Sequence, residues 1–131
     1  MKSKYLVDSE LAQALEAMPA ITPTRESLHG LRENIAQLRA VAPPAPGVTV
    51  EEKFIAGADG TSLRILLYTP VSSRLTGALL WFHGGGMVMG TPEMNDPQSR
   101  YFAHRMGCMV VAVDYRLAPD FPYPGGLDDC Y

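Results

Sequence analysis

The fold is decided by residues 77–90, which read GALLWFHGGGMVMG. The first six residues form a short continuous apolar run, which predicts a central strand covered on both faces of a sheet. His83 and the glycines Gly84, Gly85 and Gly86 follow at once, where a chain leaving the carboxyl edge of a sheet commonly builds a ligand site. Glycine lacks a Cβ atom and lets peptide N–H groups approach a ligand, which suits the stabilisation of developing negative charge. A plain glycine turn is the alternative interpretation.

A second apolar run at residues 108–113 indicates another buried strand. Between the two runs, Asp96 is a candidate N-cap followed by Pro97 at the first helical position, and Gly107 is a typical helix stop. The inward face of this helix is expected to consist of Tyr101, Phe102 and Met106. A strand, a helix and a strand in this order predict two parallel strands joined by a right-handed crossover.

The chain upstream of this unit divides into two helices, a proline-rich segment and a hairpin. Residues 48–56 and 62–69 are predicted strands, joined by a turn at 57–60, and Pro70 ends the second strand. Three prolines make residues 42–47 a linker. Two amphipathic helices precede it, one capped by Asp8 or Ser9 and one by Thr24. Their apolar positions recur at helical spacing: Leu11, Leu15 and Met18, then Leu28, Leu31, Ile35 and Leu38.

Composition and charge argue against several classes of protein. With 131 residues, of which 47% are hydrophobic and 8% aromatic, the chain has the size of a single globular domain. The net charge of -3 and the lack of a basic run argue against a nucleic-acid partner. No stretch approaches a membrane span or a secretory signal, and Cys108 and Cys130 have neither disulfide-scaffold nor zinc-ligand spacing. We therefore expect a soluble cytoplasmic protein with free thiols and no structural metal.

Two motifs together resemble the hormone-sensitive lipase family of α/β-hydrolases. The first is His-Gly-Gly-Gly at residues 83–86, and the second is Asp-Tyr-Arg-Leu-Ala-Pro at residues 114–119. Their order, spacing and strand context make the match specific over residues 46–131. The resemblance implies an α/β fold, namely the N-terminal part of an α/β-hydrolase with a mixed, mostly parallel sheet. Residues 1–45 would form a helical cap segment, a less specific match, and residues 46–131 an incomplete hydrolase core.

The resemblance also implies roles for the residues of the glycine motif. The N–H groups of Gly85 and Gly86 would form the oxyanion hole of a carboxylic ester hydrolase. His83 would help to hold the loop rather than act as the catalytic base, and Gly84 would permit its turn. A small ester would be the substrate, attacked by a serine, and no metal or organic cofactor is implied.

The second motif would support the first. Asp114, Tyr115 and Arg116 would brace the glycine loop from the end of the next strand. A purely structural histidine is the competing interpretation of the motif's histidine and, more strongly, of His29 and His104, which lie on helical faces.

The chain departs from the family pattern in one respect. The nucleophile of such a hydrolase is a Ser in Gly-x-Ser-x-Gly, followed along the chain by an Asp or Glu and then a His. None of the seven serines has these flanking glycines. Residues 127–131 resemble the first turn of a helix that the chain does not complete. We therefore expect the triad to lie in a missing C-terminal portion or a companion chain, and this chain alone to be inactive.

Two other functions stay open on the sequence. A non-catalytic ligand receptor on the same fold would keep the pocket and lose the triad. A nucleotide-binding domain would use Gly84, Gly86 and Gly90 after one strand and Asp114 at the end of the next. Its fingerprint requires the glycine loop to open directly into a helix, whereas two proline-containing pairs between residues 91 and 97 delay the helix.

Overall fold

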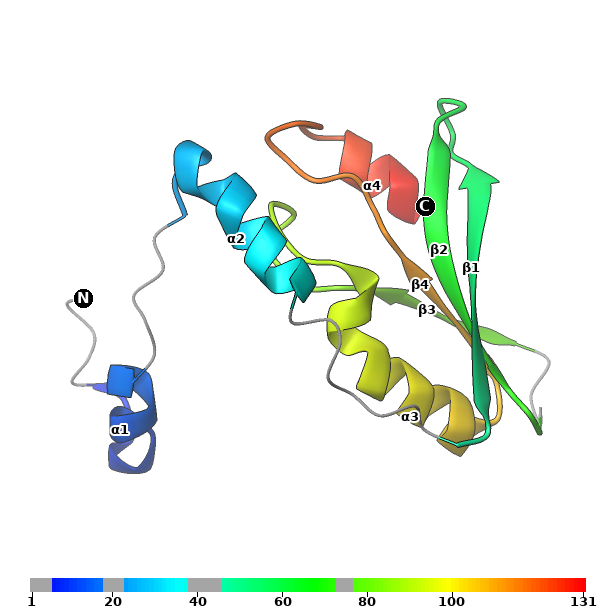
Figure 1. The fold of residues 1–131 in the computed structure, drawn as a ribbon, viewed down its shortest axis with the longest axis horizontal. Helices are drawn as coiled ribbons and strands as arrows, with labels where there is room; N and C mark the ends of the chain where they lie inside the picture. Colours follow the sequence, from blue (N-terminus) through cyan, green and yellow to red (C-terminus); the bar gives the residue numbers. More distant parts are fainter. Residues whose placement is uncertain (1–5, 18–22, 38–45, 73–76) are drawn as a thin grey trace.

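The computed structural model describes residues 6–17, 23–37, 46–72 and 77–131. Among these residues, four strands form one sheet with helices before, between and after them (Figure 1). The elements in chain order are α1 (Ser9–Ala17), α2 (Arg25–Gln37), β1 (Val48–Ala56), β2 (Ser62–Pro70), β3 (Ala78–Phe82), the 3-10 helix η3 (Pro92–Asn95), α3 (Asp96–Met106), β4 (Met109–Val113) and α4 (Gly125–Cys130).

The described strands lie in the order β1-β2-β4-β3. β1 pairs antiparallel with β2 along its whole length, with Val48 opposite Pro70, as predicted for a hairpin. β2 pairs antiparallel with β4, whereas β3 and β4 are parallel, with Phe82 opposite Val113. The mixed sheet and the parallel strand–helix–strand unit are thus confirmed. Among the described strands, parallel pairing is confined to β3 and β4. The helix α3 between them carries the chain back to the edge of the sheet at which β3 begins, so β4 runs in the same direction as β3.

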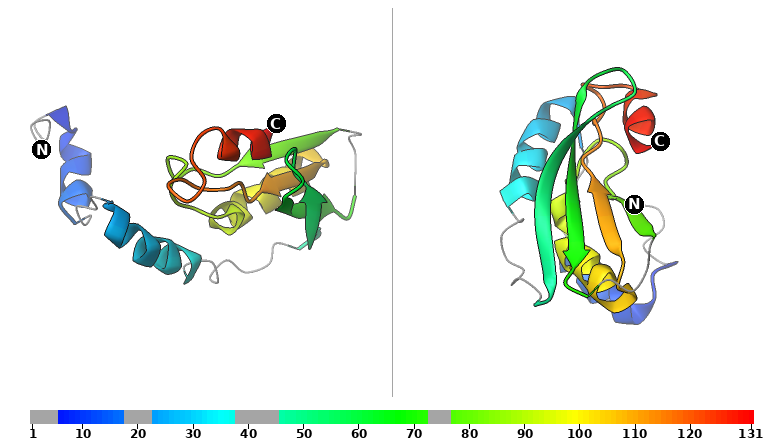
Figure 2. Two further views of the ribbon diagram at one scale, coloured as in Figure 1. Left: turned by 90° about the horizontal axis from the view of Figure 1, so that it is seen from above. Right: turned by 90° about the vertical axis from the view of Figure 1, so that its right-hand side faces the viewer.

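The two faces of the sheet build separate apolar clusters. On one face, Tyr68 and Val110 are fully buried together with Ala103 of α3. On the other face, the buried Ile65 belongs to a cluster that Cys130 of α4 packs against. Figure 2 shows α3 and α4 on opposite sides of the sheet. Successive strand residues point to opposite faces, so one strand feeds both clusters, and each fully buried aliphatic side chain stabilises the fold by about 1.5–3 kcal/mol.

The outer face of β3 is exposed, which corrects the prediction that both of its faces are covered. Leu79 and Trp81 pack on the cluster beneath α3, while Leu80 and Phe82 remain 50% and 42% exposed. The Trp81 ring lies 5.6 Å from that of Phe102. Because β3 ends the strand order of the described sheet, its outward side chains lack the cover that a further strand and its helix would give.

The ends of α3 lie close to those predicted. Asp96 is the first helical residue and Asn95 occupies the N-cap position, one residue earlier than expected. Gly107 ends the helix in the left-handed conformation, with φ of 67°, and its N–H bonds to Ala103 O at 3.0 Å. The stop at glycine follows from its freedom to adopt positive φ.

The inward face of α3 differs from the prediction. Ser99 and Ala103 are buried and Phe102 packs beside them, whereas Tyr101 and Met106 are 58% and 44% exposed. Small residues face the sheet because the helix lies close to β2 and β4, so the large side chains at its flanks point outward.

The two N-terminal helices begin as predicted. The Asp8 carboxylate accepts a hydrogen bond from Glu10 N–H at 2.9 Å, and Thr24 Oγ1 accepts one from Ser27 N–H at 3.1 Å. α1 has no buried residue and stands apart from the sheet in Figures 1 and 2, whereas α2 buries Leu28. Other predicted positions lie outside the described residues: Met18, Leu38 and residues 42–45 of the linker.

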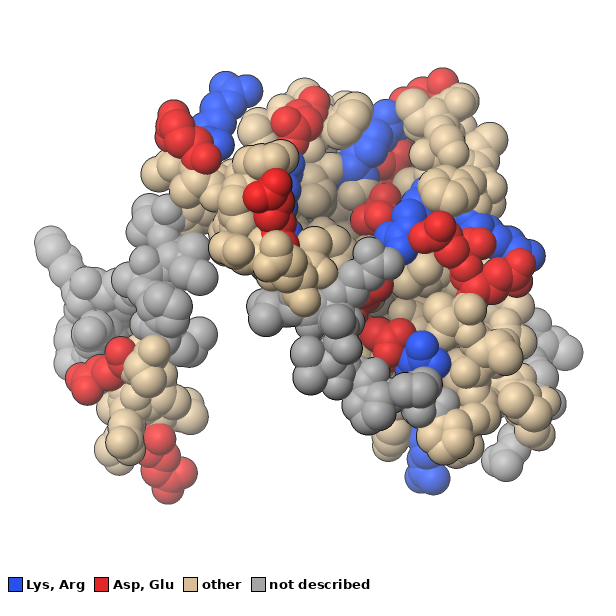
Figure 3. Space-filling model, in the orientation of Figure 1, with Lys and Arg blue, Asp and Glu red and all other residues tan. Residues whose placement is uncertain are grey.

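The face of the molecule drawn in Figure 3 carries basic side chains beside acidic ones rather than in a patch of one sign. Several basic side chains of the described residues are in ion pairs, among them Arg64 with Glu52 and Asp114. Within the described ranges, no helix is both long enough and apolar enough to cross a membrane.

Candidate active site

The glycine loop, residues 83–90, leaves the carboxyl end of β3 beside the segment that leaves β4. Parallel pairing places Phe82 opposite Val113, so the two segments emerge from the same edge of the sheet. Met87 O accepts a hydrogen bond from Ala118 N–H at 2.9 Å, which joins them further along. The two sequence motifs, separated by more than twenty residues, therefore form one site.

Glycine is required at particular positions of this loop. Gly85 and Gly86 have φ of 134° and 63°, and Gly90 has φ of 108°. A Cβ atom at Gly85 would lie 1.9 Å from Met89 O, and one at Gly90 would lie 2.5 Å from Gly84 O. Gly84 itself has no positive φ and has space for a Cβ atom. The backbone freedom that permits the turn is thus needed at Gly85 and Gly86 rather than at Gly84.

The loop is held through its carbonyl groups. Gly85 O accepts hydrogen bonds from Val88 N–H and Met89 N–H, both at 3.2 Å. By contrast, the N–H groups of Gly85 and Gly86 donate no hydrogen bond to any residue that the structure describes. Two neighbouring N–H donors on a fixed loop can bind an anionic oxygen, which is the chemistry that an oxyanion hole requires.

His83 is enclosed at the base of the loop. Its side chain is buried and stacks on Tyr115, with ring centroids 4.2 Å apart and planes inclined by 11°. Tyr115 Oη donates a hydrogen bond to His83 O at 2.6 Å, and burial raises the pKa of this phenol, which keeps its proton in place. His83 Nδ1 lies 2.9 Å from Gly84 O. These contacts favour a supporting role over that of a base.

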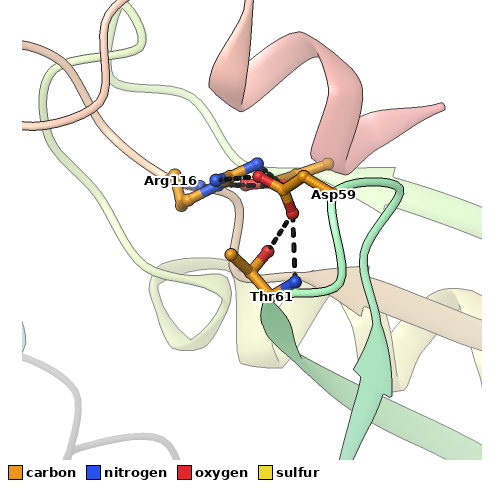
Figure 4. A network of polar contacts seen from close by, with 4 residues as sticks. Asp59, Thr61 and Arg116 are labelled. Carbon is orange, nitrogen blue, oxygen red and sulfur yellow. Dashed lines mark hydrogen bonds and ion pairs between the residues drawn. The ribbon is translucent and has the colours of Figure 1, made fainter.

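Arg116 braces the second segment from two directions (Figure 4). It binds Asp129 of α4 through its backbone N–H at 2.8 Å and through its guanidinium, and its Nη1 lies 2.7 Å from Asp59 of the hairpin turn. Thr61 donates to the same Asp59 carboxylate at 2.6 Å. Hydrogen bonds from Thr61 and Arg116 hold the pKa of Asp59 below its ordinary value.

Of the three residues expected to brace the glycine loop, Tyr115 makes a hydrogen bond to it and stacks on its histidine. Asp114 pairs with Arg64 at 2.9 Å, and Arg116 acts through neighbouring elements. A further contact comes from Arg32 of α2, a residue not predicted from the sequence, which donates to Val88 O in the glycine loop at 2.9 Å. The feature of the sequence that could have indicated Arg32 is its position as a charged residue between Leu28 and Ile35, on an otherwise apolar stripe of the helix.

An apolar hollow of about 360 Å³ opens beside the loop. Its lining is Phe82, His83, Met87, Tyr115, Leu127, Cys130 and Tyr131. The described residues contain no group of three or more metal-binding side chains. A hollow of this lining suits the apolar part of a small organic molecule.

The loop geometry does not match a dinucleotide-binding fingerprint. After Gly90 the chain forms η3 before α3 begins at Asp96, so the glycine loop does not open directly into a helix. A helix N-terminus facing the loop is what pyrophosphate binding would need.

Known proteins share this architecture. Residues 79–131 match the family of the alpha/beta hydrolase fold. Carboxylesterase NlhH of Mycobacterium tuberculosis is 33% identical over 128 residues, which are 95% of this chain and 40% of that protein. The structure of a bacterial heroin esterase matches with a TM-score of 0.81 at 33% identity, over 98% of this chain and 42% of the other. A hormone-sensitive lipase from a metagenome library matches with a TM-score of 0.73 at 26% identity, over 92% of this chain and 37% of the other.

The chain thus spans about 40% of the length of these relatives. The matched part includes β3, the glycine loop, the crossover helix and β4, which together build the site described above. The chain belongs to the hormone-sensitive lipase family of α/β-hydrolases and spans its N-terminal portion.

Proposed function

We propose that this chain supplies the oxyanion hole of a serine carboxylesterase. The observation that carries the proposal is the pair of N–H groups at Gly85 and Gly86, which are unpaired among the described residues on a loop fixed by its carbonyls. A serine attacks the ester carbonyl, and the tetrahedral intermediate carries its negative charge on the former carbonyl oxygen. The two N–H groups bind that oxygen as the charge develops.

The surroundings of the loop support an ester with an apolar group as the substrate. The surface of the hollow beside the loop is mostly apolar, and His83, Tyr115 and Tyr131 are the lining residues that carry polar side-chain atoms. Two similar proteins are named for their action on esters, a carboxylesterase and a heroin esterase. The acyl-enzyme that forms after loss of the alcohol is then hydrolysed by water.

We further propose that the nucleophile, acid and base come from a C-terminal hydrolase portion, present as a companion polypeptide or as a continuation. Three observations support this: the chain spans about 40% of its relatives, it has no Gly-x-Ser-x-Gly, and β3 presents exposed Leu80 and Phe82 beside the apolar hollow. A strand of the companion paired with β3 would cover these side chains. Residues 1–45 would then act as a cap over the substrate pocket.

The test compares this chain alone with the same chain joined to, or co-produced with, the C-terminal portion. We expect no turnover of p-nitrophenyl esters by the chain alone, and turnover by the complete enzyme that a serine-directed phosphonate abolishes. Phosphonate-sensitive turnover by the chain alone would contradict the proposal. A complete protein that binds esters without turnover would instead identify a receptor.

The oxyanion role is tested by Gly85→Pro in the complete enzyme. Proline deletes one N–H donor and, because it cannot adopt the φ of 134° found at Gly85, also distorts the backbone, so kcat should fall at least about 10²- to 10³-fold. Gly84→Ala is the matched control, because Gly84 has no positive φ and nothing within 4 Å of an added Cβ atom. An unchanged kcat in Gly85→Pro would remove Gly85 from the hole.

We also infer that the protein works in the cytoplasm. Cys108 is buried and Cys130 half-buried, and neither forms a disulfide. Thiol titration of protein isolated without reductant should find both as free thiols, and a disulfide would contradict the inference.

A further inference from the structure

The side chain of Arg32 in α2 contacts three hydrogen-bond acceptors on two loops that are distant from it in sequence. Its Nε donates to Val88 O at 2.9 Å and its Nη2 to Ala118 O at 2.6 Å. Its Nη1 lies 2.5 Å from a carboxylate oxygen of Asp120. The Arg32 side chain is 23% exposed, and its bonds to the two carbonyls are partly shielded from water, whereas the pair with Asp120 is exposed. One guanidinium thus links an N-terminal helix to the glycine loop and to the segment after β4.

The guanidinium of Arg32 closes a ring of hydrogen bonds with backbone groups of the two loops. Ala118 donates through its N–H to Met87 O and accepts at its carbonyl from Arg32, which in turn binds the carbonyl of Val88, the residue next to Met87. Val88 is held on both sides, because its N–H donates to Gly85 O. The ring therefore restrains the loop within three residues of the N–H groups of Gly85 and Gly86.

Arginine is suited to this position for a geometric reason. Its planar guanidinium presents donors in a fixed fork, whereas a lysine ammonium is a single point charge on a flexible stem. The hydrogen bond from Arg32 also holds the pKa of Asp120 below its ordinary value, so the carboxylate is ionised at neutral pH and the pair is charge-assisted.

We propose that Arg32 is a positioning residue, which couples docking of α2 to the geometry of the oxyanion loop. It does not touch the substrate in this proposal, and its effect passes through the carbonyls of Val88 and Ala118. The coupling to catalysis rests on the proposed esterase function, while the coupling to loop order does not.

Amide hydrogen exchange of this chain tests the loop order without any assay of activity. In Arg32→Gln, the N–H groups of Val88 and Ala118 should exchange about tenfold faster or more, since charge-assisted bonds that restrain the ring are removed. The amides of β2 and β4 should keep their wild-type rates. The exchange rates in Arg32→Lys should lie between those of the wild type and Arg32→Gln, because lysine keeps the positive charge but lacks the forked guanidinium.

Arg25→Gln is the matched control on the same helix. Arg25 is exposed and acts on Asp120 through its charge alone, with no hydrogen bond to a described residue. Arg25→Gln therefore removes a nearby charge without removing a restraint on the loop, and its exchange pattern should equal that of the wild type. Equal rates at Val88 and Ala118 in Arg32→Gln and Arg25→Gln would overturn the proposal. So would an equal acceleration throughout the sheet, because Arg32 would then affect only global stability.

Kinetics of the complete enzyme test whether Arg32 is coupled to catalysis. Arg32→Gln should lower kcat by up to about a hundredfold with little change in KM, as expected when a catalytic group is misplaced while the substrate still binds equally well. An effect confined to KM would overturn the coupling to catalysis. If the wild type has no esterase activity, the proposed function fails while exchange still decides the role of Arg32. If activity is present and exchange is unchanged, the positioning role fails alone.

Discussion

The hairpin turn at residues 57–61 and the glycine loop at residues 83–90 each contain glycine at positive φ, yet the glycine N–H groups of the two regions are used in opposite ways. In the turn, Gly57 N–H donates to Thr61 O at 2.8 Å and Gly60 N–H donates to Gly57 O at 2.9 Å. In the glycine loop, Gly85 and Gly86 donate to no described residue, and carbonyls carry the restraints. The loop uses the N–H groups of Val88 and Met89 for its internal bonds and leaves those of Gly85 and Gly86 outside them.

The largest expected contrast between the two regions concerns an added methyl group. Gly90→Ala would place a Cβ atom 2.5 Å from Gly84 O at φ of 108°, so overpacking adds to backbone strain. We expect the free energy of unfolding to fall by about 3 kcal/mol. Gly60→Ala is the matched control, because φ is 80° but nothing lies within 4 Å, and its cost should be about 1–2 kcal/mol.

Urea denaturation of both variants measures this contrast. Equal losses would show that the glycine loop is no more tightly packed than the hairpin turn, and would remove the steric reason for glycine at position 90.

A smaller effect is expected from Tyr115→Phe, which tests whether a hydrogen bond to a carbonyl group holds the glycine loop. The change removes the 2.6 Å hydrogen bond to His83 O and keeps the ring stacked on His83. We expect a loss of about 1 kcal/mol in the free energy of unfolding. Tyr123→Phe is the control, since Tyr123 is 85% exposed. A loss no greater than that of the control would mean that the hydroxyl does not hold the loop.

The smallest effect concerns pH and the hairpin turn. Asp59 has a pKa below its ordinary value of 3.8, chiefly because Thr61 and Arg116 bond to its ionised form. This stabilisation is fully present above pH 3.8 and is lost as the pH falls through the folded-state pKa, which lies lower. The stability advantage of the wild type over Asp59→Asn should therefore shrink on acidification below that pH.

Denaturation curves at a series of pH values test this dependence, with Asp128→Asn as an exposed control. If the stability advantage of the wild type over Asp59→Asn grew as the pH falls, the pH dependence would have the opposite sign. That result would contradict the contacts assigned to Asp59.

Much of the fold was predictable because local signals and tertiary structure agree. The caps at Asp8 and Thr24, the hairpin, the parallel unit and the stop at Gly107 all follow from residue types whose backbone preferences are strong. The face of α3 was mispredicted, because the spacing of Tyr101, Phe102 and Met106 fits more than one rotation of a helix. Contact with the sheet selects the face with small residues.

For the candidate site, residue types alone pointed to the glycine loop, because His83 and three glycines follow an apolar strand, where a chain leaving the carboxyl edge of a sheet commonly builds a ligand site. The way in which that loop is held follows from the folded chain. Arg32, Tyr115 and Ala118 are distant from it in sequence, and their bonds depend on the parallel pairing of β3 with β4 and on the docking of α2. A hydrogen bond needs its two atoms within about 3 Å, and a linear pattern carries no information on such a distance until the chain has folded.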